Sequence, residues 1–95
     1  MQPKIEYIAN HYGFKHQCIK AVEELNELAI ALAKSSTKGS LRRDAIEKIA
    51  DVEIMLAQIK YLAGISQEEI EDCKHYKLDR QMNRIKEGTD GTIRY

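Results

Sequence analysis

Hydrophobic residues recur along most of this chain at the three- and four-residue spacings of an α-helix. Within 14–34 the apolar positions follow spacings of four, three, four and three at Cys18, Val22, Leu25, Ala29 and Leu32. A second set with helical spacing lies within 41–63 at Ala45, Ile46, Ile49, Val52, Leu56, Ile59 and Leu62. Each pattern predicts a long helix with one stripe of residues facing the core.

The boundaries of these helices are marked by residues that favour caps and turns. Pro3 begins a short amphipathic segment, 3–11, and Gly13 is suited to end it. The segment 35–40, SSTKGS, has the composition of a loop. Ser40, its last residue, is suited to cap the helix that follows.

The C-terminal third of the chain predicts one more helix. Gly64 is suited to end the preceding helix in a left-handed conformation, and Ser66 and Glu69 have the spacing of a capping box. The helix then runs to Gly88, which ends it, and 89–95 is expected to be a mobile tail.

These elements predict an all-α fold in a single domain, 1–95. Because a six-residue loop joins the two long helices, we expect an antiparallel helical bundle of three main helices plus a short N-terminal helix. Several large apolar residues fall outside the main stripes, namely Ile30, Ile54, Met55 and Tyr61. Three helices would leave them exposed, so we expect a homodimer or homotetramer to complete the bundle.

Charge and composition exclude several classes of protein. Fifteen basic and fifteen acidic residues cancel, which argues against a nucleic-acid-binding protein. No apolar run approaches the roughly 20 residues of a membrane-spanning helix, and the first ten residues lack the apolar core of a signal peptide, so we expect a cytoplasmic protein without a membrane partner. Cys18 and Cys73 are too few and too far apart for a disulfide framework or a zinc site.

Acidic residues interrupt the apolar pattern of both long helices. Glu24 and Glu27 lie three residues apart and project together, with Glu23 about 100° to one side. Asp51 lies in the apolar stretch IADVEIML. Because aspartate has poor helix propensity, its presence there calls for an explanation. In an antiparallel pair of helices these acids can face each other, and converging carboxylates suit Mg²⁺ or Mn²⁺. A Glu-Glu-x-x-Glu run taken alone is more often a solvated helix face.

The two acidic segments together resemble a family motif. The chain is similar, over about residues 10–87, to the MazG-like superfamily of all-α nucleoside triphosphate pyrophosphohydrolases, which includes dimeric dUTPases and phosphoribosyl-ATP pyrophosphohydrolases. Its pattern is Glu-Glu-x-x-Glu followed on the next helix by Glu-x-x-Asp; here it reads EELNE at 23–27 and KIAD at 48–51. The flanking stretches YGFKHQ, IADVEIML and KLDRQMNRI resemble the small phage and prophage members.

The resemblance implies hydrolysis of the α–β phosphate linkage of a nucleoside triphosphate, giving a monophosphate and pyrophosphate. It implies that Glu24, Glu27 and Asp51 are ligands of Mg²⁺, or of Mn²⁺ in its place. Glu23 or Glu27 would assist the attack of a water molecule. Positioning and electrostatics carry most of such a reaction.

The last helix and the start of the second supply candidate substrate contacts. Four cations recur along the last helix and are candidates to hold the phosphates: Lys74, Lys77, Arg80 and Arg84. The alternative is a solvated basic stripe that pairs with Glu71 and Asp72. Candidates to contact the nucleoside are His16, Gln17 and Tyr76.

Lys48 departs from the family pattern, because it stands where the motif has glutamate. The sequence is compatible with four arrangements. In the first, the Lys48 ammonium group takes part of the space of the metal ion beside Asp51 and Glu24, and the protein is a pseudo-enzyme. In the second, Glu47 turns in as a substitute ligand. In the third, a single metal held by Glu24, Glu27 and Asp51 supports slow turnover, and in the fourth Lys48 points to solvent toward Asp44.

Two functions from different classes follow. The first is a Mg²⁺-dependent nucleotide pyrophosphohydrolase of reduced or altered activity, acting on an NTP or dNTP. The second is a catalytically silent helical dimer that binds a nucleotide or a protein partner.

Overall fold

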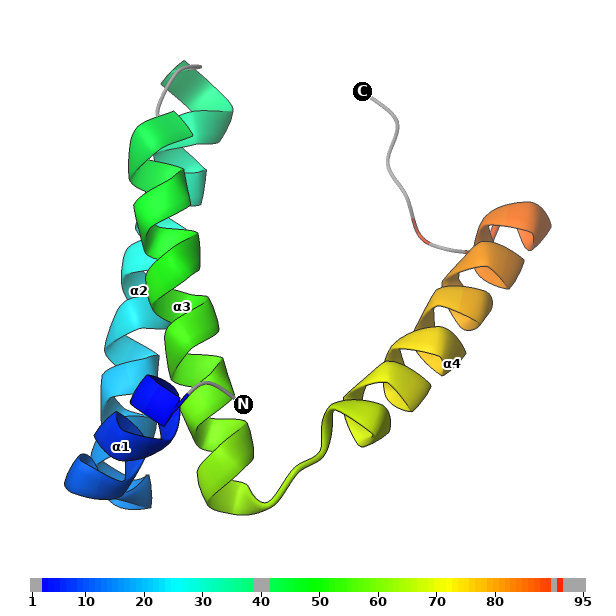
Figure 1. The fold of residues 1–95 in the computed structure, drawn as a ribbon. Coiled ribbons are helices and arrows are strands. Elements are labelled where there is room, and N and C mark those ends of the chain that lie inside the picture. The colour runs from blue at the N-terminus through cyan, green and yellow to red at the C-terminus, as the bar shows by residue number, and fades with distance from the viewer. Residues whose placement is uncertain (1–2, 39–41, 90, 92–95) are drawn as a thin grey trace. The chain divides into compact units, whose positions relative to one another are not determined.

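The protein is all-α, as the periodicity predicts (Figure 1). The computed structural model describes residues 3–38, 42–89 and 91. Its four helices are α1 (Pro3–Tyr12), α2 (Phe14–Lys38), α3 (Arg42–Ala63) and α4 (Gln67–Glu87). The contacts group the chain into two compact units, Met1–Gly64 and Ile65–Tyr95. None of the helices in the described ranges has the length and hydrophobicity needed to cross a bilayer.

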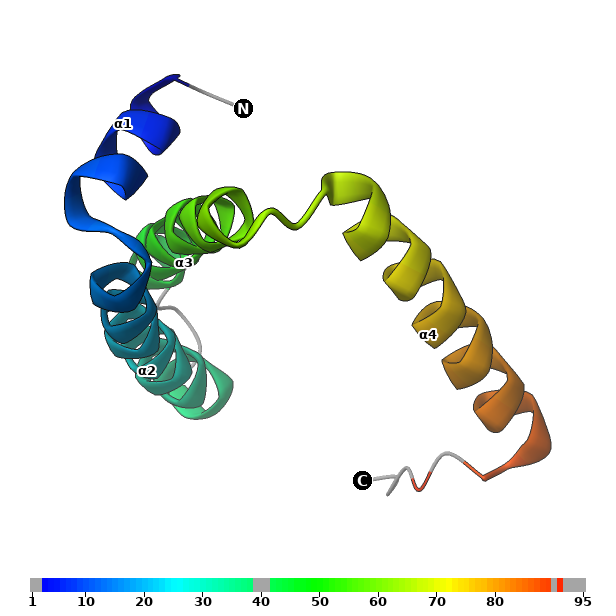
Figure 2. The same ribbon diagram turned by 90° about the horizontal axis from the view of Figure 1, so that it is seen from below.

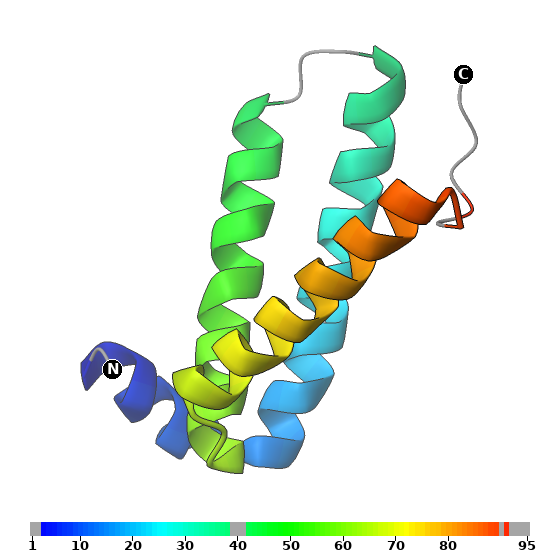
Figure 3. The same cartoon turned by 90° about the vertical axis from the view of Figure 1, so that its right-hand side faces the viewer.

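The first unit is a helical hairpin with a third helix across one end. The long helices α2 and α3 run side by side in opposite directions, and α1 packs against both at the end opposite their connection (Figures 1 and 3). The view along the pair in Figure 2 shows α1 beside the ends of both long helices. This arrangement confirms the antiparallel pairing expected from the short connection.

Glycine ends α1 and α3 as predicted, while α2 ends later than predicted. Gly13 and Gly64 have φ values of 85° and 68°, the left-handed conformation that glycine adopts without steric cost. Residues 35–38, expected in a loop, are the last turn of α2. Ser35 is accommodated in the helix because its Oγ donates a hydrogen bond to the carbonyl oxygen of Ala31, at 2.9 Å. The cap predicted at Ser40 lies outside the described residues.

The buried face of α2 is not the predicted one. Its buried residues are Gln17, Ala21, Glu24 and Ala31, each one position before a residue of the predicted stripe. The predicted stripe faces outward instead, with Val22, Leu25 and Leu32 exposed by 57%, 46% and 50%. Small alanine side chains let two helices approach closely, so packing favours this face although the neighbouring stripe is more hydrophobic.

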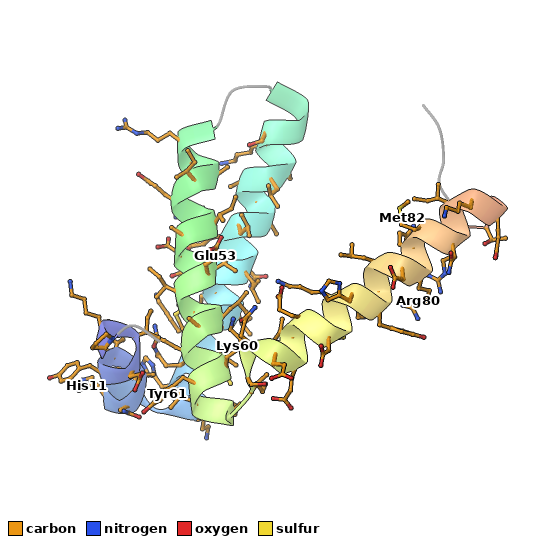
Figure 4. The ribbon with its side chains drawn as sticks, turned by 45° about the vertical axis from the view of Figure 1, so that its right-hand side comes forward. His11, Glu53, Lys60, Tyr61, Arg80 and Met82 are labelled. Atoms are coloured by element: carbon orange, nitrogen blue, oxygen red, sulfur yellow. The ribbon has the colours of Figure 1, made fainter. Side chains whose placement is uncertain are left out.

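Two residues expected to need a partner subunit are covered within one chain. Met55 is 5% exposed. Tyr61 is half-buried beside α1, where its hydroxyl oxygen accepts a hydrogen bond from Asn10 Nδ2 at 2.9 Å (Figure 4). Ile30 and Ile54 are exposed by 56% and 44% in the single chain, as expected. The predicted dimer or tetramer stays a prediction.

The second unit contains α4, whose ends match the prediction. Glu69 N–H donates to Ser66 Oγ at 3.1 Å, and Ser66 N–H donates to a Glu69 carboxylate oxygen at 2.8 Å. Together these bonds form the capping box. Gly88, with φ 71°, ends the helix in a left-handed conformation. Most of the predicted tail, 89–95, lies outside the described residues.

The capping box predicts a pH-dependent start of α4. The hydrogen bond from the Ser66 backbone holds the pKa of Glu69 below its ordinary value of 4.5. The stabilisation is therefore present above pH 4.5 and is lost as pH falls through the lower pKa of the folded state. Cα chemical shifts of residues 67–70 should lose helical character on acidification through this range. Glu69→Gln should lack this transition while Glu68→Gln keeps it; an unchanged transition in Glu69→Gln would contradict the assignment.

Candidate functional site

The polar residues on the buried face of α2 are the starting point of the candidate site. Gln17 and Glu24 lie seven residues apart, two helical turns, and so share one face. Their exposed fractions are 3% and 9%. Buried carboxylates and amides are costly unless they find partners, so the partners of these two side chains define the site.

Glu24 is only partly satisfied. Its Oε1 lies 3.4 Å from Nζ of Lys20, one turn earlier on α2. Its Oε2 is buried and has no hydrogen-bond partner in the part of the chain that the structure describes. An unpartnered carboxylate oxygen in this position is suited to accept a cation or a hydrogen-bond donor.

Lys20 also contacts the neighbouring acid. Its Nζ lies 3.3 Å from Oε2 of Glu23, which is exposed. The hydrogen bonds to Glu23 and Glu24 raise the pKa of Lys20 above its ordinary value, so the ammonium charge is retained at neutral pH. Lys20 was not among the predicted site residues, although its position four residues before Glu24 is a recognisable ion-pair spacing.

The other predicted metal ligands, Glu27, Glu47 and Asp51, are less buried than Glu24. Glu27 and Glu47 are exposed, and Asp51 is half-buried on α3. Across residues 3–38, 42–89 and 91, no three His, Cys, Asp or Glu side chains form a group that could hold a metal ion. The helices thus bring the two halves of the motif onto packed elements without assembling a full set of protein ligands.

Lys48, in place of the motif's glutamate, is half-buried on α3. Its ammonium group forms no ion pair with Glu24, Asp51 or Asp44 among the residues that the structure describes. The lysine that contacts Glu24 is therefore Lys20, from the same helix, and not Lys48 from the opposite one.

A pocket of about 570 Å³ is lined by residues of α1, α2 and α3, among them the acidic residue Glu23. Its size is within the range of small-molecule sites. The apolar part of its wall consists of Ile8, Ile19, Ile54 and Met55, and the polar part of Tyr12, His16, Gln17, Lys20, Glu23 and Gln58. Two predicted nucleoside contacts and one predicted catalytic residue therefore share a pocket wall.

A hydrogen-bonded chain of side chains crosses the base of this pocket. Gln17 Nε2 donates to Gln58 Oε1 at 2.7 Å, which leaves Gln17 Oε1 as an acceptor facing His16 Nδ1 at 2.6 Å. With this orientation of the Gln17 amide, the imidazole of His16 donates from Nδ1 to Gln17 Oε1. The Tyr12 ring stacks on His16, with centroids 4.7 Å apart and an interplanar angle of 15°. Gln58 and Tyr12 were missed from sequence, although Gln58 is a lone amide in the apolar run IMLAQIKYLA.

The predicted phosphate-binding cations lie on α4, in the second unit. All four are exposed: Lys74, Lys77, Arg80 and Arg84. Lys74 pairs with Glu71 at 3.1 Å, and this hydrogen bond lowers the pKa of Glu71 below its ordinary value. The Arg80 guanidinium (labelled in Figure 4) lies 5.5 Å from the centre of the Tyr76 ring, a cation–π contact between two predicted substrate residues.

Comparisons with family models, with curated proteins and with solved structures give no match to this chain. The all-α architecture that the resemblance implies is present in the structure. Membership of the MazG-like superfamily stays a prediction, supported by the motif residues themselves.

The buried amide pair predicts a measurable coupling. Replacing Gln58 by methionine would leave Gln17 Nε2 without its acceptor and should destabilise the protein by about 1–3 kcal/mol. Because the double variant Gln17→Met/Gln58→Met leaves neither amide behind, it should cost less than the sum of the two single changes. Urea denaturation of all four proteins measures this cycle. Purely additive losses would show that the two amides do not depend on each other.

Proposed function

We propose that this protein is a Mg²⁺-dependent nucleoside triphosphate pyrophosphohydrolase of the MazG-like type. The observation that carries the proposal is Glu24, a buried carboxylate with an unpartnered oxygen, whose ion-pair partner Lys20 lines a pocket of about 570 Å³. A protein gains nothing in stability from such an oxygen, so a ligand that satisfies it is the simplest reason for its presence.

A divalent cation fits the residues present. Mg²⁺ keeps several waters and is typically held by one or two carboxylates together with substrate phosphates, so it does not require a complete protein cage. Glu24 would be the anchor, Glu27 and Asp51 would complete the set with the substrate, and Glu47 would be the substitute for the glutamate that Lys48 replaces. When bound, the ion would neutralise phosphate charge and polarise an attacking water.

The chain's own residues supply the remaining roles. Glu23 lines the pocket and is exposed, so it is placed to accept a proton from a water molecule beside a bound ligand. His16 presents an imidazole to a nucleobase, Gln17 orients that imidazole through its amide oxygen, and Tyr12 adds an aromatic ring.

Because of Lys48, we expect a lower activity than the complete motif would give. A protonated lysine cannot act as a metal ligand, and at this position it removes one of the five acids of the motif. A specific observation favours the second candidate, a catalytically silent helical dimer that binds a nucleotide or a protein: in the described ranges no three acids converge.

The proposed homodimer would form through the outward stripe of α2. Val22, Leu25 and Leu32 are about half exposed, and with the exposed Ala29 they follow the spacings of three, four and three residues of a coiled-coil seam. A second copy would present the same stripe, and pairing of two such stripes is the self-complementary contact of a two-fold dimer. A homotetramer would arise by further pairing of the exposed Ile30 and Ile54.

Substitution of Glu24 tests the enzyme. Glu24→Gln keeps the size of the side chain but removes its charge, and should lower pyrophosphate release from NTPs and dNTPs in Mg²⁺ by roughly a hundredfold. Glu53→Gln, an exposed acid on α3, is the matched control and should retain activity. Lys48→Glu should raise turnover. Absence of any pyrophosphate release from the wild type and from Lys48→Glu would favour the silent dimer.

Placing a charge in the outward stripe tests the dimer. Leu25→Glu should shift the protein from dimer to monomer in analytical ultracentrifugation, because an unpaired carboxylate would be buried at the seam. Asn26→Glu adds the same charge one residue away, on the exposed surface beside the stripe, and should leave the dimer intact. Equal sedimentation of the two variants would exclude α2 as the interface.

A further inference from the structure

Lys20 holds a position that none of the roles above explains. Its ammonium group lies between two acids, 3.3 Å from Glu23 and 3.4 Å from the buried Glu24. The same side chain lines the pocket that contains His16 and Gln17. Lys20 therefore forms an ion pair with the Glu24 carboxylate and is also part of the pocket wall.

We infer that Lys20 is an exchangeable counter-ion: it occupies Glu24 when no metal is bound, and it turns to the phosphate of the pocket's ligand when a divalent cation takes the carboxylate. This inference rests on the proposed function, because it requires a cation at Glu24 and an anionic ligand in the pocket. It adds a residue with a positioning role that lies outside the acidic motif.

Electrostatic repulsion disfavours a divalent cation and the Lys20 ammonium group at Glu24 at the same time. A divalent cation at Glu24 would place two positive charges beside the ammonium group, in a site where burial weakens solvent screening. Movement of the side chain relieves this repulsion, because the four-carbon lysine stem allows the charged group to move several ångströms without a change in the backbone.

The contact with Glu23 that Lys20 would give up contributes little to stability, and the metal ion would replace Lys20 as the partner of the buried Glu24. The Lys20 side chain is 48% exposed and that of Glu23 is 60% exposed, and ion pairs between exposed groups contribute little to stability. A phosphate in the pocket would offer the released ammonium a stronger, doubly charged partner. Metal and anion binding would thus support each other through one side chain, as linkage requires.

Calorimetric titration of Lys20→Met tests the exchange. Titration with Mn²⁺ alone should show roughly fivefold tighter binding than in the wild type, because the competing ammonium is gone. Titration of a non-hydrolysable dNTP analogue at saturating Mn²⁺ should show roughly fivefold weaker binding, because the phosphate contact is gone. Lys20→Arg should keep both affinities near wild type. Lys15→Met, an exposed lysine on the same helix, removes the same net charge and should change neither.

The opposite signs of the two effects separate exchange from a structural role. If Lys20→Met weakens both Mn²⁺ and nucleotide binding, or leaves Mn²⁺ binding unchanged, the exchange is wrong even though the enzyme is active. If the wild type releases no pyrophosphate while Lys20→Met binds Mn²⁺ more tightly, the proposed function fails and the exchange stands. If no variant binds Mn²⁺, the cation site at Glu24 is refuted and the exchange with it.

Discussion

The close packing of α2 against α3 is the constraint on which the rest of the first unit depends. The face of α2 that is buried consists of small and polar residues, among them Ala21 and Ala31, which are 7% and 1% exposed. Small side chains allow a short distance between helix axes, and a short distance leaves no room for water around the polar residues between them. The polar residues on this face must therefore find partners within the protein or in a ligand.

Gln17 and Glu24 meet this requirement in different ways. Gln17 is satisfied on both sides, by Gln58 from α3 and by His16 from its own helix. Glu24 has one oxygen near Lys20 and the other without a partner. A protein that buried both groups for stability alone would satisfy both, so the contrast between them separates a structural polar group from a candidate ligand-binding one.

The same packing determines what lies outside. Turning the small face of α2 inward turns Val22, Leu25 and Leu32 outward. Large apolar residues that recur at coiled-coil spacing on an exposed face are a recurrent mark of association. The site and the proposed subunit contact are thus two consequences of one choice of helix face, and both lie on α2.

Helix number, type and most boundaries were predictable from the sequence, because they depend on local patterns: apolar spacing, glycines at 13, 64 and 88, and the Ser66–Glu69 capping box. The end of α2 was not, because a serine can be accommodated in a helix through a bond to the preceding turn. The acidic motif and its departure at Lys48 were also visible in the sequence. Which face of α2 is buried was decided only by tertiary packing, since periodicity identifies a stripe but does not measure how closely two helices approach. For the same reason only the structure could show that the lysine beside Glu24 is Lys20, and that Gln58 reaches Gln17 from 41 positions away in the chain.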